Sequence, residues 1–271
     1  MIEDFNGRVA VVTGGASGIG KAIAAASKDA GMTVVIADIE EAALAATCDE
    51  LGVNGWRTDV TDPESVSSLA THVRTRFGTC DVLFNNAGVA GNGLITEQTL
   101  NDWNWVIDVN IRGVVHVIHE FLPMMLENTR NTHIVNTASI AGLTSVVSAP
   151  YTATKYAVVG ISESMRDELS DTTVGVSVLC PGLVRTNLVK SERNRPVAFA
   201  NAEAGRRVRK WSLPTTVQPA LLEPAVVADM TLAAVRNGEF WILTDPSLLA
   251  LSWPRYEELR LIAFPDEPAT S

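Results

Sequence analysis

The chain has few cysteines and few cationic side chains for its length of 271 residues. Its three cysteines, Cys48, Cys80 and Cys180, lack the spacing of a metal site and cannot all pair as disulfides, which suits a reducing compartment. We therefore expect them to be core thiols. Lys and Arg number 21 against 31 Asp and Glu, a formal net charge of -10. Because phosphates are neutralised by a basic surface, this charge argues against a nucleic-acid partner.

Long apolar runs and linker-like stretches are also missing. Hydrophobic residues make up 46% of the chain, enough for a core, but they fall in short runs, whereas a membrane-spanning helix needs about 20 apolar residues. The beginning, Met1 to Asp4, is acidic and lacks the basic-then-apolar layout of a secretory signal. These features predict a cytoplasmic protein with no membrane partner. Since no linker divides the chain, residues 1–271 are expected to form one domain.

Short β-rich runs alternate with longer segments of helical periodicity, the pattern of βαβ units. This predicts the α/β class: a single Rossmann-type, doubly wound domain with a seven-stranded, mostly parallel sheet and helices on both faces. The strands are expected at Arg8–Thr13, Thr33–Asp38, Gly55–Asp59, Val82–Asn86, His133–Thr137, Val174–Cys180 and Phe240–Thr244. The helices are expected near Gly18–Ala30, Glu40–Leu51, Pro63–Phe77, Leu100–Glu127, Pro150–Ser170 and Pro224–Asn237.

A glycine-rich turn joins the first strand to the first helix. Gly14, Gly18 and Gly20 follow the strand in a Gly-x-x-x-Gly-x-Gly spacing, which departs from the Gly-x-Gly-x-x-Gly dinucleotide fingerprint. Glycines let the backbone approach a pyrophosphate, and the free N–H groups and dipole of the helix N-terminus stabilise its charge. The context of strand, turn and helix predicts a dinucleotide site.

Asp38 closes the second strand, where a carboxylate can accept hydrogen bonds from both adenosine ribose hydroxyls. It would also repel a 2'-phosphate. Ile39 follows, and no Arg or Lys stands at or just after the strand end, so the residues favour NAD over NADP. Asp38 can in addition be the N-cap of the next helix.

A second constellation lies in the middle of the chain. Tyr151 and Lys155 are spaced i, i+4 and share a helix face, so the ammonium is expected to lower the pKa of the phenol from its free value of about 10. That makes Tyr151 a candidate acid/base. Ser139 follows an apolar strand and is placed at the carboxyl edge, where open α/β sheets bind ligands.

Together with Asn85-Asn86-Ala87-Gly88, Asn110 and Pro181-Gly182, these motifs resemble the short-chain dehydrogenase/reductase family over residues 7 to about 244. The resemblance implies an oxidoreductase with a fixed set of catalytic residues. These are Asn110, Ser139, Tyr151 and Lys155. Tyr151 would exchange the proton with the substrate oxygen that Ser139 orients, Lys155 would tune Tyr151 and bind the nicotinamide ribose, and Asn110 would hold a water linking Lys155 to solvent.

The resemblance also implies the cofactor, its site and the assembly. The cofactor is NAD, and no metal is expected although His116 and His119 share a helix face. The implied cofactor-binding residues are Gly14, Ser17, Gly18, Ile19, Gly20, Asp38, Ile39, Asp59, Val60, Asn86, Ala87, Gly88, Tyr151, Lys155, Pro181, Gly182, Val184 and Thr186. The assembly implied is a homotetramer.

The residues expected to line the substrate pocket follow the fourth, fifth and sixth strands and are mostly apolar. They are Val89, Ala90, Gly91, Ile140, Ala141, Leu143, Val146, Val147, Leu183 and Val184. They predict a bulky hydrophobic or aromatic secondary alcohol or ketone. A substrate loop is expected at about 184–222 and a flexible tail at about 265–271. Between Val189 and Glu223 seven basic side chains stand against three acidic ones, which we interpret as a solvated helical face.

Two alternatives remain open. One is an NADP-dependent carbonyl reductase with the same mechanism. Asp38 argues against this alternative, because its carboxylate would repel the 2'-phosphate of NADP. The other is a catalytically idle dinucleotide-binding sensor or scaffold, which would have no need of the intact set of four catalytic residues.

Overall fold

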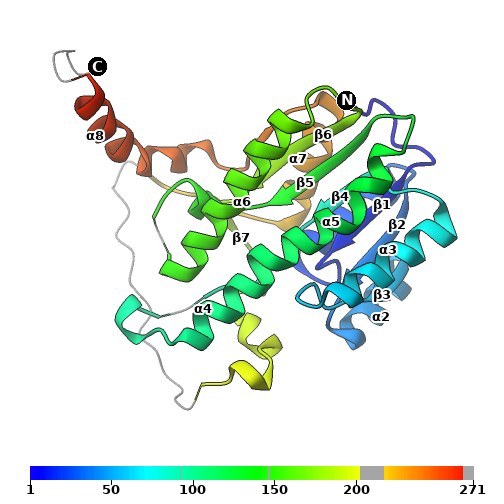
Figure 1. Ribbon diagram of the computed structural model, residues 1–271, viewed down its shortest axis with the longest axis horizontal. Helices are drawn as coiled ribbons and strands as arrows, with labels where there is room; N and C mark the ends of the chain where they lie inside the picture. The colour runs from blue at the N-terminus through cyan, green and yellow to red at the C-terminus, as the bar shows by residue number, and fades with distance from the viewer. Residues whose placement is uncertain (92, 146, 202–216, 265–271) are drawn as a thin grey trace.

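The computed structural model describes residues 1–91, 93–145, 147–201 and 217–264. In these residues seven strands form one sheet whose neighbours all run parallel, in the order β3-β2-β1-β4-β5-β6-β9 (Figure 1). The strands are β1 (Val9–Thr13), β2 (Thr33–Asp38), β3 (Asn54–Arg57), β4 (Val82–Asn85), β5 (Thr132–Thr137), β6 (Val174–Cys180) and β9 (Trp241–Leu243). The predicted fold class is confirmed, and the sheet is parallel throughout.

Helices cover both faces of the sheet (Figure 1). They are α1 (Gly18–Asp29), α2 (Glu41–Leu51), α3 (Pro63–Phe77), α4 (Leu100–Ile107), α5 (Gly113–Leu126), α6 (Ala149–Glu168), α7 (Pro224–Asn237) and α8 (Trp253–Ala263). One apolar core joins α1, α2 and α7 to one face, and two others join α3, α5 and α6 to the opposite face. Every residue of β1 is buried, as expected of a parallel strand covered on both sides.

Shorter elements complete the described chain. Leu183–Val184 (β7) and Leu221–Leu222 (β8) pair as a separate two-stranded sheet. Short segments of 3-10 helix lie at Ile95–Glu97, Ile140–Gly142, Leu188–Asn194, Val197–Phe199 and Pro246–Leu251. Cys80 and Cys180 are buried free thiols, whereas Cys48 is half-buried, so two of the three are the expected core thiols.

The order of the strands reverses between β1 and β4: the chain winds outward to β3 on one side and to β9 on the other. At such a switch point the loops leave the carboxyl ends of neighbouring strands in opposite directions and open a crevice, where ligands of this fold class bind. The glycine turn after β1 and the Asn85-Asn86-Ala87-Gly88 segment after β4 therefore face one another.

The helix predicted over Leu100–Glu127 is interrupted. Between α4 and α5 the residues Asp108–Arg112 form a turn of π-helix that contains Asn110. This turn brings Asn110 fully inside, where its carboxamide bonds the backbone of Val89. A π turn leaves the apolar period of its flanks almost intact, so the sequence pattern does not reveal it.

The other elements agree with the predicted ranges to within two residues; the third strand ends at Arg57 instead of Asp59. The side chain of Asp59 accepts two hydrogen bonds from Thr61, one from its N–H at 2.9 Å and one from its hydroxyl at 2.7 Å. These bonds form a turn that takes the chain out of the sheet. Helix α8 was not predicted, and it projects away from the sheet (Figure 1). The expected tail at 265–271 and residues 202–216 of the expected substrate loop lie outside the described residues.

Among the residues described, no helix combines the length and the apolar character that crossing a bilayer requires.

Candidate active site

One cavity runs along the carboxyl ends of the strands. It is lined by the ends of β1, β2, β4, β5 and β6, by the residues that follow β3, and by the segment after β7. Of the expected cofactor-binding residues all but Gly20 line it, and so do Ser139, Tyr151 and Lys155. Asn110 does not line it. The sequence motifs, far apart in the chain, are thus brought together in one place.

The glycine turn is held against the segment after β4. Gly14 and Gly18 have φ of +65° and +54°, which favour glycine. Thr13 Oγ1 accepts hydrogen bonds from the N–H groups of Asn86 at 2.9 Å and Ala87 at 3.0 Å, and Asn86 Nδ2 donates to the Thr13 carbonyl at 3.1 Å. The two loops are therefore held together by three hydrogen bonds.

Gly20 contributes by close packing instead of by lining the cavity. A Cβ atom at this position would lie 2.2 Å from the Gly14 carbonyl oxygen and 2.6 Å from Asn86 Nδ2. No side chain fits in that space, so the first turn of α1 can approach the loop only because residue 20 is glycine.

Asp38 lies beside the glycine turn with both carboxylate oxygens fixed. The N–H of Ala16 donates to Oδ2 and the N–H of Glu40 donates to Oδ1, each at 3.0 Å. Burial raises the pKa of this carboxyl, and the two backbone hydrogen bonds oppose the shift. The N-cap of α2 is Glu40 and not Asp38. The carboxylate is thus positioned by backbone groups on both sides and faces the cavity.

Lys155 carries its amine into the interior. Nζ donates to the Thr137 carbonyl at 2.8 Å, and the residue is only 3% exposed. Burial lowers its pKa to about 8. Gly88 packs against it: a Cβ there would be in ordinary contact with Lys155 Nζ at 3.5 Å and in tight contact with Asn110 Oδ1 at 3.3 Å.

Tyr151 is buried one helical turn earlier on α6. Burial raises its pKa to about 12, although a hydrogen bond with Ser139 acts in the opposite direction. The expectation of a lowered pKa is therefore wrong for the protein without cofactor. The reason is geometric: Lys155 Nζ lies 5.6 Å from the centre of the phenol ring and binds Thr137, so the loss of hydration dominates.

Asn110 is fully occupied by protein groups. Its Oδ1 accepts from the N–H of Val89 at 2.9 Å, while Nδ2 donates to the Val89 carbonyl at 3.0 Å and to Thr154 Oγ1 at 3.1 Å. These contacts tie the π turn to the loop after β4 and to α6. The side chain thus braces the site, and the water contact expected of Asn110 stays a prediction.

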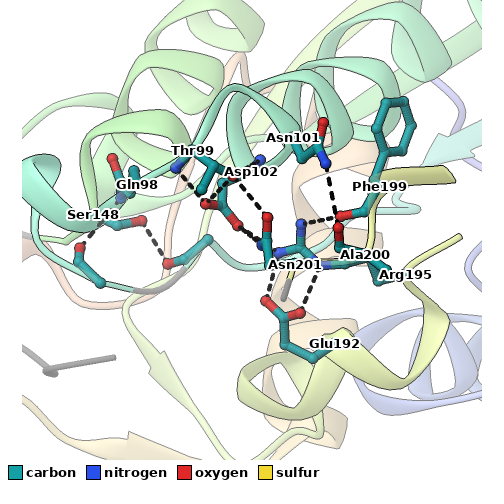
Figure 2. Close-up of polar contacts among 12 residues, drawn as sticks. Gln98, Thr99, Asn101, Asp102, Ser148, Glu192, Arg195, Phe199, Ala200 and Asn201 are labelled. Carbon is teal, nitrogen blue, oxygen red and sulfur yellow. Dashed lines mark hydrogen bonds and ion pairs between the residues drawn. The ribbon is translucent and has the colours of Figure 1, made fainter. Parts of the chain in front are cut away.

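The segment Leu188–Asn201 covers the cavity, and sequence reasoning missed how it does so. Of its three basic residues, Lys190 and Arg193 are exposed as expected, whereas the side chain of Arg195 is only 7% exposed. The other four basic residues of the expected solvated face, Arg206, Arg207, Arg209 and Lys210, lie outside the described residues. Arg195 Nη2 donates to Asp102 Oδ1 at 2.9 Å and to Glu192 Oε1 at 2.7 Å, and its guanidinium lies 4.3 Å from the ring of Trp105. Figure 2 shows Arg195 between the two carboxylates.

Further contacts attach the same segment to its surroundings (Figure 2). Asn201 Nδ2 donates to Asp102 Oδ1 at 2.9 Å, Asn101 Nδ2 donates to the Ala200 carbonyl at 3.3 Å, and the N–H of Ala90 donates to Ser191 Oγ at 2.9 Å. No pattern in the segment itself could predict these contacts, because Asp102, Asn101 and Ala90 lie about 100 residues earlier in the chain.

The apolar wall of the cavity differs from the predicted one. Of the residues expected there, only Val89 and Val184 line the cavity, while Val146 lies outside the described residues. Ile140 is instead in a separate apolar cluster with Val217 and Leu248. The wall is completed by Trp105, Val109, Leu188 and Pro196.

In the described part of the chain, no three His, Cys, Asp or Glu side chains are gathered as a metal site would require. His116, one of the two histidines that share a helix face, has its Nδ1 2.9 Å from the Val60 carbonyl oxygen.

Comparisons with known proteins agree with this geometry. Residues 8–196 match the family model for short chain dehydrogenases. The chain is 32% identical to a "CLA biosynthesis dehydrogenase/reductase" of Lactiplantibacillus plantarum over 98% of this chain and 97% of the relative. It is 31% identical to a "C alpha-dehydrogenase" of Sphingobium sp., over 91% of this chain and 83% of that one. This chain therefore belongs to the short-chain dehydrogenase/reductase family.

A solved structure gives the same result. A short chain dehydrogenase/reductase from Burkholderia phymatum in complex with NAD superposes with a TM-score of 0.88 at 39% identity, covering 100% of both chains. Our chain is thus an oxidoreductase of the family whose relatives include dehydrogenases.

The packing of Gly20 can be tested by substitution. In Gly20→Ala the new methyl group must displace the Gly14 carbonyl or Asn86, so we expect a loss of about 1–3 kcal/mol in the free energy of unfolding and at least about tenfold weaker NADH binding. Urea unfolding and fluorescence titration measure the two effects. Gly160→Ala is the control, because nothing lies within 4 Å of a Cβ there. Tight NADH binding by Gly20→Ala would contradict the packing role.

Proposed function

We propose that this protein is an NAD-dependent oxidoreductase that interconverts a secondary alcohol and a ketone. The observation that carries the proposal is that Ser139, Tyr151 and Lys155 line the same cavity as the glycine turn and Asp38. A proton-exchanging group and a dinucleotide cradle thus share one space, as transfer of a hydride and a proton to the same substrate requires.

The described residues fit NAD. The turn from Gly14 to Gly20 would hold the pyrophosphate, Asp38 the adenosine ribose hydroxyls, and Lys155 the nicotinamide ribose. Asp59 and Val60 would contact the adenine, and Thr186 the carboxamide. When bound, the cofactor supplies the hydride acceptor or donor.

The protein's own chemistry is the transfer of one proton. Tyr151 would give its hydroxyl proton to the carbonyl oxygen during reduction and take it back during oxidation. Ser139, hydrogen-bonded to Tyr151, would hold the same oxygen. Lys155 lies 5.6 Å from the phenol ring, so its charge favours the phenolate once the substrate oxygen draws on the proton.

The apolar wall supports a bulky hydrophobic or aromatic substrate. Trp105, Val109, Leu188 and Pro196 line the cavity together with Val89, and an apolar lining of this kind favours a hydrophobic substrate.

The alternative of an NADP-dependent reductase has one observation in its favour, because Arg193 lines the cavity. Its guanidinium is paired with Glu40, however, and Asp38 repels a 2'-phosphate. NAD therefore remains the proposed cofactor. The alternative of a catalytically idle sensor predicts no turnover, and the next experiment measures turnover.

Tyr151→Phe should lower turnover about 100- to 10,000-fold, because only the proton-carrying hydroxyl is removed. NADH binding should stay within about twofold, since the ring that shapes the cavity remains. Turnover is followed by absorbance of the reduced cofactor with a panel of secondary alcohols. Tyr156→Phe is the matched control on the same helix, where the lost hydroxyl contacts Arg255, and it should keep its activity. Substantial activity in a folded Tyr151→Phe protein would remove this residue from the role.

Alcohol oxidation should accelerate with pH through an apparent pKa near 8. The first proton of the Tyr151 and Lys155 pair leaves at the lower of the two values, about 8 for Lys155 against about 12 for Tyr151. After that one proton is lost, the pair exists either as a phenolate with an ammonium or as a phenol with an amine. These two forms hold the same number of protons, so both appear at the same apparent pKa. Oxidation should thus be slow below the apparent pKa, and ketone reduction should slow above it. Rates of both directions between about pH 6 and 10 provide the check; a flat oxidation profile would contradict it.

A homotetramer is part of the proposal. Helix α8 exposes Trp253, Tyr256, Leu259 and Ile262, apolar side chains that a symmetric assembly would cover. Light scattering should give about four times the chain mass of 29.0 kDa at micromolar concentration, and a monomeric mass would disprove it. A reducing, cytoplasmic location is likewise proposed, supported by the free Cys48, Cys80 and Cys180.

A further inference from the structure

Arg193 and Glu40 both line the cavity and form a direct ion pair. In the described part of the chain, the cations that line the cavity are Lys155 and Arg193. Arg193 Nε donates to Glu40 Oε2 at 3.1 Å, and Nη2 donates to Oε1 at 2.5 Å. Asn194 Nδ2 adds a hydrogen bond to the same Oε1 at 2.9 Å. These donors hold the pKa of the Glu40 carboxyl below its usual value, so it is charged at neutral pH.

The pairing uses the edge of the guanidinium that would otherwise bind a phosphate. Arginine recognises carboxylates and phosphates through the same fork of two parallel N–H groups. In Arg193 this fork, Nε with Nη2, is filled by Glu40. The remaining nitrogen, Nη1, donates to the carbonyls of Lys190 at 3.0 Å and Asn187 at 3.4 Å. The guanidinium is therefore anchored by its own segment, with or without Glu40.

Glu40 is itself tied to Asp38, since its N–H donates to Asp38 Oδ1 at 3.0 Å. The fork of Arg193 thus lies beside the carboxylate that would bind the adenosine ribose. A 2'-phosphate brought here would meet two carboxylates and a guanidinium that is already neutralised. The fold therefore contains the cation that an NADP site needs, Arg193, but Glu40 occupies its hydrogen-bonding edge.

We propose that Glu40 is a second determinant of cofactor choice, which excludes NADP by occupying the phosphate-binding fork of Arg193. The inference rests on the proposed NAD-dependent function and extends it. Asp38 acts by repulsion, whereas Glu40 acts by competition for a cation. Removal of the Glu40 side chain should therefore free the Arg193 fork to bind the 2'-phosphate. Removal of a repelling carboxylate alone would not create such a contact.

The test compares the dissociation constants of NADPH and NADH by fluorescence titration at one ionic strength. In Glu40→Ala the ratio Kd(NADPH)/Kd(NADH) should fall about tenfold or more, the effect expected of charged hydrogen bonds to a phosphate. In Glu40→Ala/Arg193→Gln the ratio should return close to that of the unmodified protein. The side chains of Glu40 and Arg193 are 28% and 39% exposed, respectively. Their ion pair therefore adds little stability, and both variants should fold.

The matched control is Glu127→Ala, which breaks an exposed pair with Arg74 far from the cavity and should leave the ratio unchanged. An unchanged ratio in Glu40→Ala would overturn the inference, as would a gain that persists without Arg193. If the unmodified protein binds NADH and Glu40→Ala shows no change, only this inference fails. If the unmodified protein does not bind NADH, or prefers NADPH, the proposed function fails and takes the inference with it.

Discussion

The candidate site depends on one buried cation. An ammonium group taken out of water is costly, and the fold compensates Lys155 with a single short hydrogen bond to the Thr137 carbonyl at the end of β5. That bond fixes α6 to the carboxyl edge of the sheet and so sets where Tyr151 stands. Gly88 lies against both this amine and Asn110, which the π turn carries inward. The interruption of the helix and the position of Tyr151 are thus parts of one arrangement.

Local signals in the sequence were sufficient for most of this architecture. Buried runs such as β1 and the proline start of α3 carry their conformation in a few neighbouring residues, and the glycine turn identifies itself by its spacing between strand and helix. Because parallel strands expose their carboxyl ends at one edge, the strand assignment alone brings Asp38, Ser139 and the glycines together. Asp38, Ser139, Gly14 and Gly18 line the cavity in the structure.

The features that escaped prediction depend on contacts between distant segments. The sequence predicts that Arg195 is a surface charge, because its contacts with Asp102 and Trp105 are visible only in the fold. The pKa of Tyr151 has the opposite direction because the distance to Lys155, not the i, i+4 spacing, decides whether the ammonium or the loss of hydration dominates. The π turn at Asp108–Arg112 leaves the apolar period nearly undisturbed. Each of these outcomes is set by three-dimensional distance, which a linear pattern does not contain.

The contact between Arg195 and Trp105 has a consequence for how such a protein can diversify. The same indole forms part of the cavity wall and lies against the guanidinium that fixes the covering segment. A smaller side chain at position 105 would enlarge the space for substrate and, in the same step, loosen the segment that carries Arg193. The proposed substrate wall and the proposed cofactor determinant are therefore connected through one indole, so a change at position 105 that admits a new substrate should also affect the position of Arg193.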